Sequence, residues 1–235
     1  MSYKYLLLDL DGTLLDFKAA QRDAFFACCR RFSVFADNNT HTRYDAFNES
    51  LWKKLERGEI TREQLFKTRF AGFFESEGVK GIDAPAFQKA YMVELSKGSH
   101  LTEGAWELLE KLHGKYSLNV ITNGVALTQR RRLKDSGIER FFDNLVISEE
   151  IGFEKPDIRY FEKAVENCGI ADKSEVLVIG DSLSADISGG LGAGFDVCWF
   201  NPEAMSCPES LSPTFIISDF DGLLKILETE VSTAK

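Results

Sequence analysis

The sequence predicts an α/β protein in which helices cover both faces of a parallel sheet. Three observations lead to this fold class. Short apolar runs recur along the chain, helical patterns separate most of them, and a long segment after the first run contains helical patterns alone. A near-continuous apolar run is typical of a strand buried on both faces. Strands that alternate with helices at this spacing form a Rossmann-like, doubly wound parallel sheet with right-handed crossovers.

The first predicted strand spans residues 3–9, and five later apolar runs share its character. These later runs are residues 118–122, 144–147, 176–179, 197–200 and 214–217. Helical patterns occupy most of the intervals between them, at residues 103–114, 126–136, 158–167 and 184–191.

The segment from residue 12 to about residue 99 contains helical patterns without a convincing strand. The helical stretches are residues 17–35, 43–56, 62–77 and 85–97, and turn signals such as those at residues 38–40 separate them. We therefore predict two domains. Residues 1–15 and 100–235 form the α/β domain, and residues 16–99 form an all-helical domain inserted directly after the first strand.

Composition narrows the class of protein. The chain has 235 residues, 44% of them hydrophobic, which is ordinary for a soluble globular protein. Its formal net charge of −9 argues against binding to nucleic acid polymers or anionic membranes. Five cysteines without a CxxC pair indicate reduced thiols, and no apolar run approaches the length of a membrane span or signal peptide. We therefore expect a cytoplasmic protein.

Two carboxylates mark the end of the first predicted strand. Asp9 and Asp11 are two residues apart, so they point to the same side of an extended segment, at the strand end where α/β sheets bind ligands. Like charges this close repel unless a cation lies between them, and carboxylate oxygens favour Mg²⁺. Gly12 permits a tight turn that aims backbone N–H groups back at the site. The alternative is a plain acidic turn after a strand.

Polar residues also follow two later parts of the pattern. Thr122, Asn123 and Gly124 come directly after a strand, and a hydroxyl with turn N–H groups suits a phosphate oxygen. The alternative for Thr122 is helix capping. Lys155 precedes a predicted helix and could place a fixed cation in the site, although a lone lysine is usually a solvated surface residue.

A second pair of acids follows the strand 176–179. Asp181 repeats the strand-end carboxylate, and Asp186 lies about one helical turn further along. Capping by Asp181 or by Ser182 is again the alternative. The two acid pairs, the polar turn at residues 122–124 and Lys155 favour a functional site when they are taken together. Each follows an independent signal for a buried strand or precedes a predicted helix, and capping alone does not explain all four.

These motifs resemble those of a known family. Asp9-Leu-Asp11-Gly-Thr13, Thr122 at a strand end, Lys155-Pro and Gly180-Asp181-Ser-x-x-x-Asp186 resemble the four motifs of the haloacid dehalogenase (HAD) superfamily. The helical insert is similar to the first type of cap domain in that superfamily. Several further segments resemble its pyrimidine 5′-nucleotidase branch: Asn48-Glu-Ser-Leu-Trp52, Gly58-Glu-Ile-Thr61, Ile121-Thr-Asn-Gly124, Leu145-Val-Ile-Ser-Glu-Glu150 and Cys198-Trp-Phe-Asn201.

The resemblance implies a role for each acid. Asp9 would be the nucleophile that forms an aspartyl-phosphate. Asp11 would protonate the leaving alkoxide and then activate the hydrolytic water. Mg²⁺ would be bound by Asp9, the backbone carbonyl of Asp11 and Asp181, with Asp186 in a supporting position.

The resemblance also assigns the phosphate-binding groups. Thr122 and the backbone of Asn123 and Gly124 would hold phosphoryl oxygens, and Lys155 would offset negative charge. The residue type at the position of Asp11 differs between the reaction classes of the superfamily. The dehalogenases lack this second carboxylate, and the ATP-driven pumps usually carry Thr there. The presence of Asp11 favours phosphatase or phosphomutase chemistry.

We therefore expect a Mg²⁺-dependent phosphomonoester hydrolase whose partner is a small-molecule phosphate ester, a 5′-nucleotidase acting on pyrimidine nucleoside monophosphates. The alternatives are a phosphatase of sugar phosphates, phosphoglycolate or pyrophosphate, a phosphomutase, or a catalytically idle relative that binds a phospho-ligand. We expect a monomer or a homodimer.

Three remaining motifs favour structural roles. The acids Asp219 and Asp221 are interpreted as capping the last helix, and the glycines of residues 189–194 as close packing at a helix end. The basic run at residues 130–132, with Lys134, is interpreted as a solvated helix face, in preference to a nucleic-acid patch.

Overall fold

The computed structural model describes residues 3–233 of the chain, and their side chains up to residue 229. Contacts between Cα atoms divide the chain into two compact units. We call residues 1–16 with 100–235 the α/β unit and residues 17–99 the helical unit. No helix in the described part of the chain is both long enough and apolar enough to cross a membrane.

A parallel six-stranded sheet forms the centre of the α/β unit, in the order β3-β2-β1-β4-β5-β6. The strands are β1 (Tyr5–Asp9), β2 (Ser117–Thr122), β3 (Asn144–Ile147), β4 (Val176–Gly180), β5 (Asp196–Phe200) and β6 (Phe215–Ile217). The predicted fold class is confirmed, and each strand lies within two residues of its predicted bounds.

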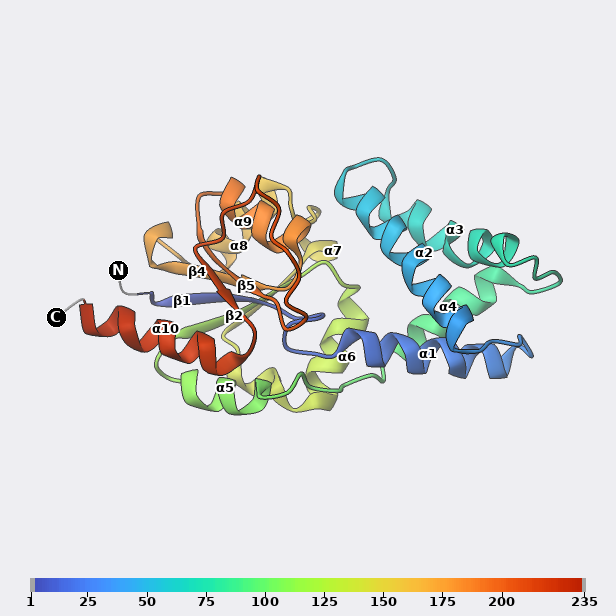
Figure 1. The fold of residues 1–235 in the computed structure, drawn as a ribbon, viewed down its shortest axis with the longest axis horizontal. Helices are drawn as coiled ribbons and strands as arrows, with labels where there is room; N and C mark the ends of the chain where they lie inside the picture. The colour runs from blue at the N-terminus through green and yellow to red at the C-terminus, as the bar shows by residue number, and fades with distance from the viewer. Residues whose placement is uncertain (1–2, 234–235) are drawn as a thin grey trace. The chain divides into compact units, whose positions relative to one another are not determined.

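Helices cover both faces of this sheet because the alternate residues of its buried strands are apolar. In β1, Leu6 and Leu8 join one core and Leu7 joins the other. The first core includes residues of α5 (Ala105–Leu112), α6 (Ala126–Ser136) and α10 (Phe220–Thr233). The second includes residues of α8 (Ile158–Asn167) and of the π-helical turn η3 (Leu183–Ile187), which leads into α9 (Ser188–Gly192). Figure 1 shows α5 and α10 on one side of the sheet and α8 and α9 on the other.

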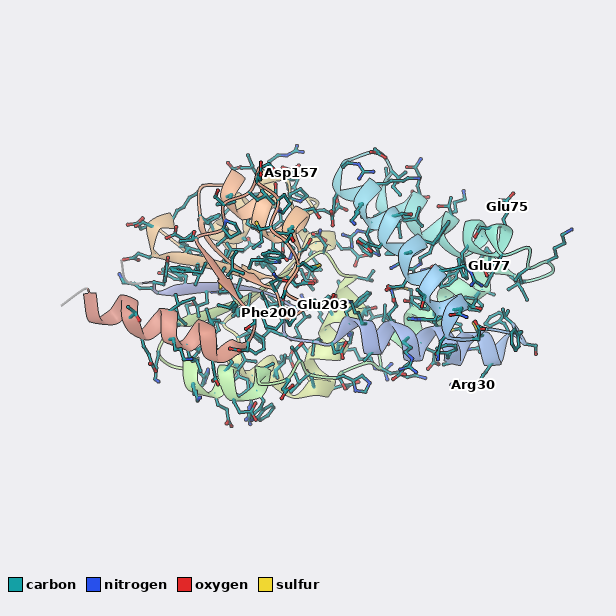
Figure 2. All side chains as sticks on the ribbon, in the orientation of Figure 1. Arg30, Glu75, Glu77, Asp157, Phe200 and Glu203 are labelled. Carbon is teal, nitrogen blue, oxygen red and sulfur yellow. The ribbon has the colours of Figure 1, made fainter. Side chains whose placement is uncertain are left out.

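The helical unit contains α1 (Phe17–Arg31), α2 (Asn38–Glu56), α3 (Arg62–Ser76) and α4 (Ala84–Leu95). Its core is aromatic: the Tyr44 ring stacks on the Phe25 ring at a centroid distance of 4.7 Å and on the Phe70 ring at 5.2 Å. A peripheral ion pair joins α2 to the end of α3, where Arg43 donates to Glu77. Glu77 is labelled in Figure 2.

One predicted turn is wrong. Residues 38–40 begin α2 instead of breaking the helical pattern. The reason is a capping box, in which the backbone N–H of Thr40 donates to Asp37 Oδ1 at 2.8 Å and the Thr40 hydroxyl accepts from the Asp37 backbone N–H. The polar residues that suggested a turn therefore mark a helix start. The short helices η1 (Ile138–Phe141), α7 (Ser148–Ile151) and η2 (Lys173–Glu175) were not predicted.

Two of the structural interpretations are confirmed. Asp219 Oδ1 accepts from the backbone N–H of Gly222 at 2.9 Å in the first turn of α10, where the ring of Phe220 stacks on that of Phe200 (Figure 2). The glycines of α9 allow close packing, since a Cβ at Gly190 would lie 2.7 Å from Val197.

Candidate active site

The carboxyl ends of β2, β1 and β4 are neighbours in the sheet, and they bring three of the predicted residues to one edge. Thr122 and Asp9 end their strands, and Asp181 directly follows Gly180, the last residue of β4. Parallel strands have their carboxyl ends at the same edge, which is where open α/β sheets bind ligands.

A buried lysine joins two of the acids. Lys155 Nζ donates to Asp9 Oδ1 and to Asp186 Oδ1, each at 2.6 Å, and to the backbone carbonyl of Ile121 at 3.1 Å. The side chain of Lys155 is 2% exposed, so it is not the solvated surface lysine that the sequence left open. These contacts fill the three donor positions of an ammonium group.

Burial and charge shape the protonation of this group. Burial by itself lowers the pKa of Lys155, but the carboxylates of Asp186 and Asp9 outweigh it and raise the pKa overall. Lys155 is therefore a permanent cation. Burial, followed by the nearby Asp186 carboxylate, raises the pKa of Asp9 well above its ordinary value, while Lys155 opposes that rise.

Three carboxylates can share a cation. Asp9, Asp181 and Asp186 each offer an oxygen, and these oxygens lie within 4.8 Å of one another. Burial and the Asp186 carboxylate raise the pKa of Asp181 to about 7. The Lys155 ammonium contacts Asp9 and Asp186 and supplies one positive charge beside three acids. A second cation with a preference for oxygen ligands fits this donor set, and Mg²⁺ is such a cation.

Two neighbours hold the acids in place. The Thr13 hydroxyl lies 3.2 Å from Asp9 Oδ2 and 3.4 Å from Asp181 Oδ1. The Trp199 indole N–H donates to the backbone carbonyl of Asp181 at 2.9 Å. Gly12 has a φ of +87°, and a Cβ there would overlap the Asp181 carboxylate. Glycine at this position therefore permits both the turn and its close approach to the acids.

The turn after β2 contacts the site differently from the sequence-based expectation. Asn123 was predicted to offer its backbone to a phosphate, and its side chain has a contact that sequence reasoning missed. Asn123 Nδ2 donates to the backbone carbonyl of Lys155, and the Lys155 backbone N–H donates to Asn123 Oδ1, both at 2.8 Å. The backbone N–H of Gly124 donates to Thr122 Oγ1 at 3.0 Å. The turn thus fixes the loop that carries Lys155.

The Asp11 side chain is not one of the three grouped acids and contacts α6 instead. Its Oδ2 accepts from Gln129 Nε2 at 2.7 Å, and its Oδ1 accepts from Arg132 Nη1. Gln129 Nε2 also donates to Thr122 Oγ1 at 2.8 Å. The Asp11 side chain is 24% exposed, whereas that of Arg132 is fully buried.

The interpretation of residues 130–132 as a solvated helix face is therefore wrong for one of the three. Arg130 and Arg131 are exposed and form ion pairs with Glu150 and Asp135, but Arg132 points into the site. A helix turns by about 100° per residue, so Arg132 shares the buried face of α6 with Leu133 and Gln129. That phase, anchored on the apolar Leu133, is the sequence signal that could have found both polar residues.

A known family, known proteins and solved structures are similar to this chain. Residues 3–194 match a family model for haloacid dehalogenase-like hydrolases. The chain is similar to the putative HAD-hydrolase YfnB of Bacillus subtilis, with 36% identity over 97% of each chain. A crystal structure of YfnB, bound to magnesium and described as revealing interdomain movement, has a TM-score of 0.92 and covers 97% of this chain and 99% of that one.

Two further relatives carry the name pyrimidine 5′-nucleotidase. PynA of Streptococcus pneumoniae is 35% identical over 98% of each chain. YjjG of Escherichia coli is 34% identical over 97% of this chain and 99% of its own length. The likeness to all three relatives extends over nearly the whole chain, including the helical unit.

Proposed function

This chain belongs to the haloacid dehalogenase-like hydrolase family, and we propose that it is a Mg²⁺-dependent 5′-nucleotidase that hydrolyses pyrimidine nucleoside monophosphates through an aspartyl-phosphate on Asp9. The family and the named relatives make the chain a hydrolase of phosphoric monoesters, as the sequence predicted. We propose in addition that the hydrolase uses Mg²⁺, forms a covalent intermediate on Asp9 and acts on pyrimidine nucleotides.

The observation that carries the mechanism is the environment of Asp9. Its side chain is 8% exposed, contacts the Lys155 ammonium at 2.6 Å and lies in a group of three acids that suits a divalent cation. A phosphate dianion can approach a carboxylate nucleophile only where positive charge offsets their repulsion. Lys155 supplies one fixed positive charge there, and Mg²⁺ held by Asp9, the backbone carbonyl of Asp11 and Asp181, with Asp186 in support, would supply the remainder.

In the proposed first step, an Asp9 oxygen attacks phosphorus and the bond from phosphorus to the ester oxygen breaks. Asp11 gives a proton to that departing oxygen. In the second step water attacks the phosphorus, its proton passes to Asp11, and the bond between Asp9 and phosphorus breaks. Thr122 and the N–H groups of the following turn would hold the phosphoryl oxygens through both steps.

The substrate class is supported by the relatives. PynA and YjjG are named for pyrimidine nucleotides, and each is about equally similar to this chain along its full length. We therefore assign the small-molecule substrate to the pyrimidine nucleoside 5′-monophosphates.

The test is phosphate release with Mg²⁺ from a panel of pyrimidine and purine nucleoside monophosphates, sugar phosphates, phosphoglycolate and pyrophosphate, with Asp9→Asn as control. We expect a clear preference for the pyrimidine nucleotides and no release by Asp9→Asn. Release confined to the sugar phosphates, phosphoglycolate or pyrophosphate would overturn the nucleotidase assignment and keep the chemistry. Silence across the whole panel would overturn the hydrolase mechanism and favour a phosphomutase or an idle phospho-ligand binder.

A further inference from the structure

Both carboxylate oxygens of Asp11 are held by side chains of α6. Gln129 Nε2 reaches Oδ2 at 2.7 Å, and Arg132 Nη1 reaches Oδ1. The two donors also contact each other, since Arg132 Nη1 donates to Gln129 Oε1 at 3.2 Å. Asp11 is therefore fixed in direction by a pair of residues three positions apart on one helix face.

We propose that Gln129 and Arg132 are positioning residues that place Asp11 for proton transfer to the leaving oxygen. This inference rests on the proposed function, because it takes Asp11 as the proton donor and Thr122 as a phosphate ligand. Neither Gln129 nor Arg132 belongs to the four motifs that identified the site, and neither is proposed to touch the substrate.

The burial of the pair argues against a purely stabilising role. Gln129 is 1% exposed and Arg132 is 0% exposed. Burying a guanidinium against a carboxylate is weak evidence for stability, because an apolar side chain of similar size often serves as well or better. The carboxylate on which Arg132 is held belongs to a partly exposed residue at the site edge. The arrangement is therefore better explained by control of Asp11.

Gln129 also links the proton donor to the phosphate-binding residue. Its Nε2 lies 2.7 Å from Asp11 Oδ2 and 2.8 Å from Thr122 Oγ1, so one amide group sets the separation of these two atoms. The turn is shaped around this amide, because a Cβ at Gly124 would overlap the Gln129 side chain. A phosphate held by Thr122 would consequently have its ester oxygen at a defined place relative to Asp11.

Proton transfer needs hydrogen-bond distance between the donor and the departing oxygen, and general acid catalysis contributes roughly 10²- to 10⁴-fold. Loss of the pair should therefore slow only those reactions that need the proton. A nucleoside monophosphate has a poor alkoxide leaving group, whereas p-nitrophenolate departs without protonation. The ratio of the two rates reports on the placement of Asp11, and a general loss of structure would lower both.

The experiment compares kcat/KM for a pyrimidine nucleoside monophosphate and for p-nitrophenyl phosphate in the wild type, Arg132→Met and Gln129→Met. We expect the nucleotide value to fall about 30-fold and the aryl ester value to fall less than about threefold in each variant. Arg132→Lys, which keeps the charge and one possible donor contact, should recover part of the ratio. Asp11→Asn gives the ratio for complete loss of the proton donor.

Arg131→Met is the matched control, since Arg131 is the adjacent arginine of α6 but is exposed and pairs with Asp135. It should leave the ratio at the wild-type value. Equal losses on both esters in the folded Arg132 and Gln129 variants would overturn the inference, and so would an unchanged or increased nucleotide rate. If Arg132→Met does not fold, as judged by circular dichroism, the ratio of kcat/KM values for Gln129→Met tests the inference. A wild type that hydrolyses neither ester would contradict the proposed function itself.

Discussion

The Asn123 side chain helps to fix the position of the positively charged Lys155 in the site. Its two hydrogen bonds to the backbone of Lys155 join the turn after β2 to the segment before α8, across 32 positions of the sequence. The ammonium of Lys155 then reaches Asp9 and Asp186 from a fixed backbone. The position of the cation therefore depends on Asn123 as well as on the carboxylates.

We predict that Asn123→Ala lowers kcat about tenfold or more, because Lys155 loses its backbone support, while the free energy of unfolding falls by about 2 kcal/mol for the two lost hydrogen bonds. Asn201→Ala is the matched control, since Asn201 makes the same two-way contact with the backbone of Met205, at 2.9 Å in each direction. It should lose similar stability and keep the wild-type kcat. Equal effects of both variants on kcat would refute the positioning role of Asn123.

The positions of the main site residues could be predicted from sequence because they depend on local rules. Asp9, Thr122 and Asp181 each follow a recognisable buried strand, and the ends of parallel strands meet. The contact between Arg132 and Asp11 could not be predicted in this way, because it joins residues 121 positions apart through the packing of α6 on the sheet. The phase of α6 about the apolar Leu133 could have indicated that Arg132 is buried, but it does not say which residue Arg132 contacts.

At the scale of the element, the first turn of α2 carries a histidine among aromatic rings. The His41 ring lies 5.5 Å from the Phe25 centroid and 5.7 Å from that of Phe26. Burial lowers the pKa of His41, an effect that Asp45 opposes and Arg22 reinforces. The folded helical unit therefore disfavours the imidazolium form.

This shift has a defined sign for stability. Below the ordinary histidine pKa of about 6.5 the unfolded chain takes up a proton that folded His41 resists, so its contribution to stability is lost as the pH falls. We predict that His41→Phe loses less thermal stability than the wild type between about pH 7.5 and about pH 5.5. The other titrating groups are shared, so the difference between the two melting profiles isolates His41. Parallel profiles would contradict the prediction.

The predicted helix ends were correct where the periodic pattern was long. They were wrong where capping side chains set the start of the helix. α6 and α8 match their predicted ranges, residues 126–136 and 158–167. The start of α2 was missed, because Asp37 and Thr40 satisfy the helix N-terminus with side chains that are equally common in turns.

At the scale of the whole molecule, the doubly wound sheet could be predicted because every central strand has its own apolar run. The specificity for a substrate could not, because it depends on side chains brought together by tertiary packing. The fold does concentrate three carboxylates at one sheet edge, and this excess of negative charge opposes folding until a cation offsets it.

We predict that Mg²⁺ raises the melting temperature of the protein, corresponding to about 2.7 kcal/mol at roughly a hundred times its Kd. Because the pKa of Asp181 is about 7 without metal, protons should compete with Mg²⁺ and weaken its binding as the pH falls below that value. Asp181→Asn should reduce the Mg²⁺-dependent shift. Asp219→Asn, which alters a carboxylate at the start of α10 outside the group of three acids, should retain it. An equal shift in Asp181→Asn would argue against this cation site.

Acid quenching during turnover of a nucleoside monophosphate with labelled phosphate is the decisive test of Asp9 as the nucleophile. We expect label bound covalently to the wild-type protein at Asp9, released by hydroxylamine, and absent from Asp9→Asn. Steady turnover without protein-bound label, or label that persists in Asp9→Asn, would contradict it.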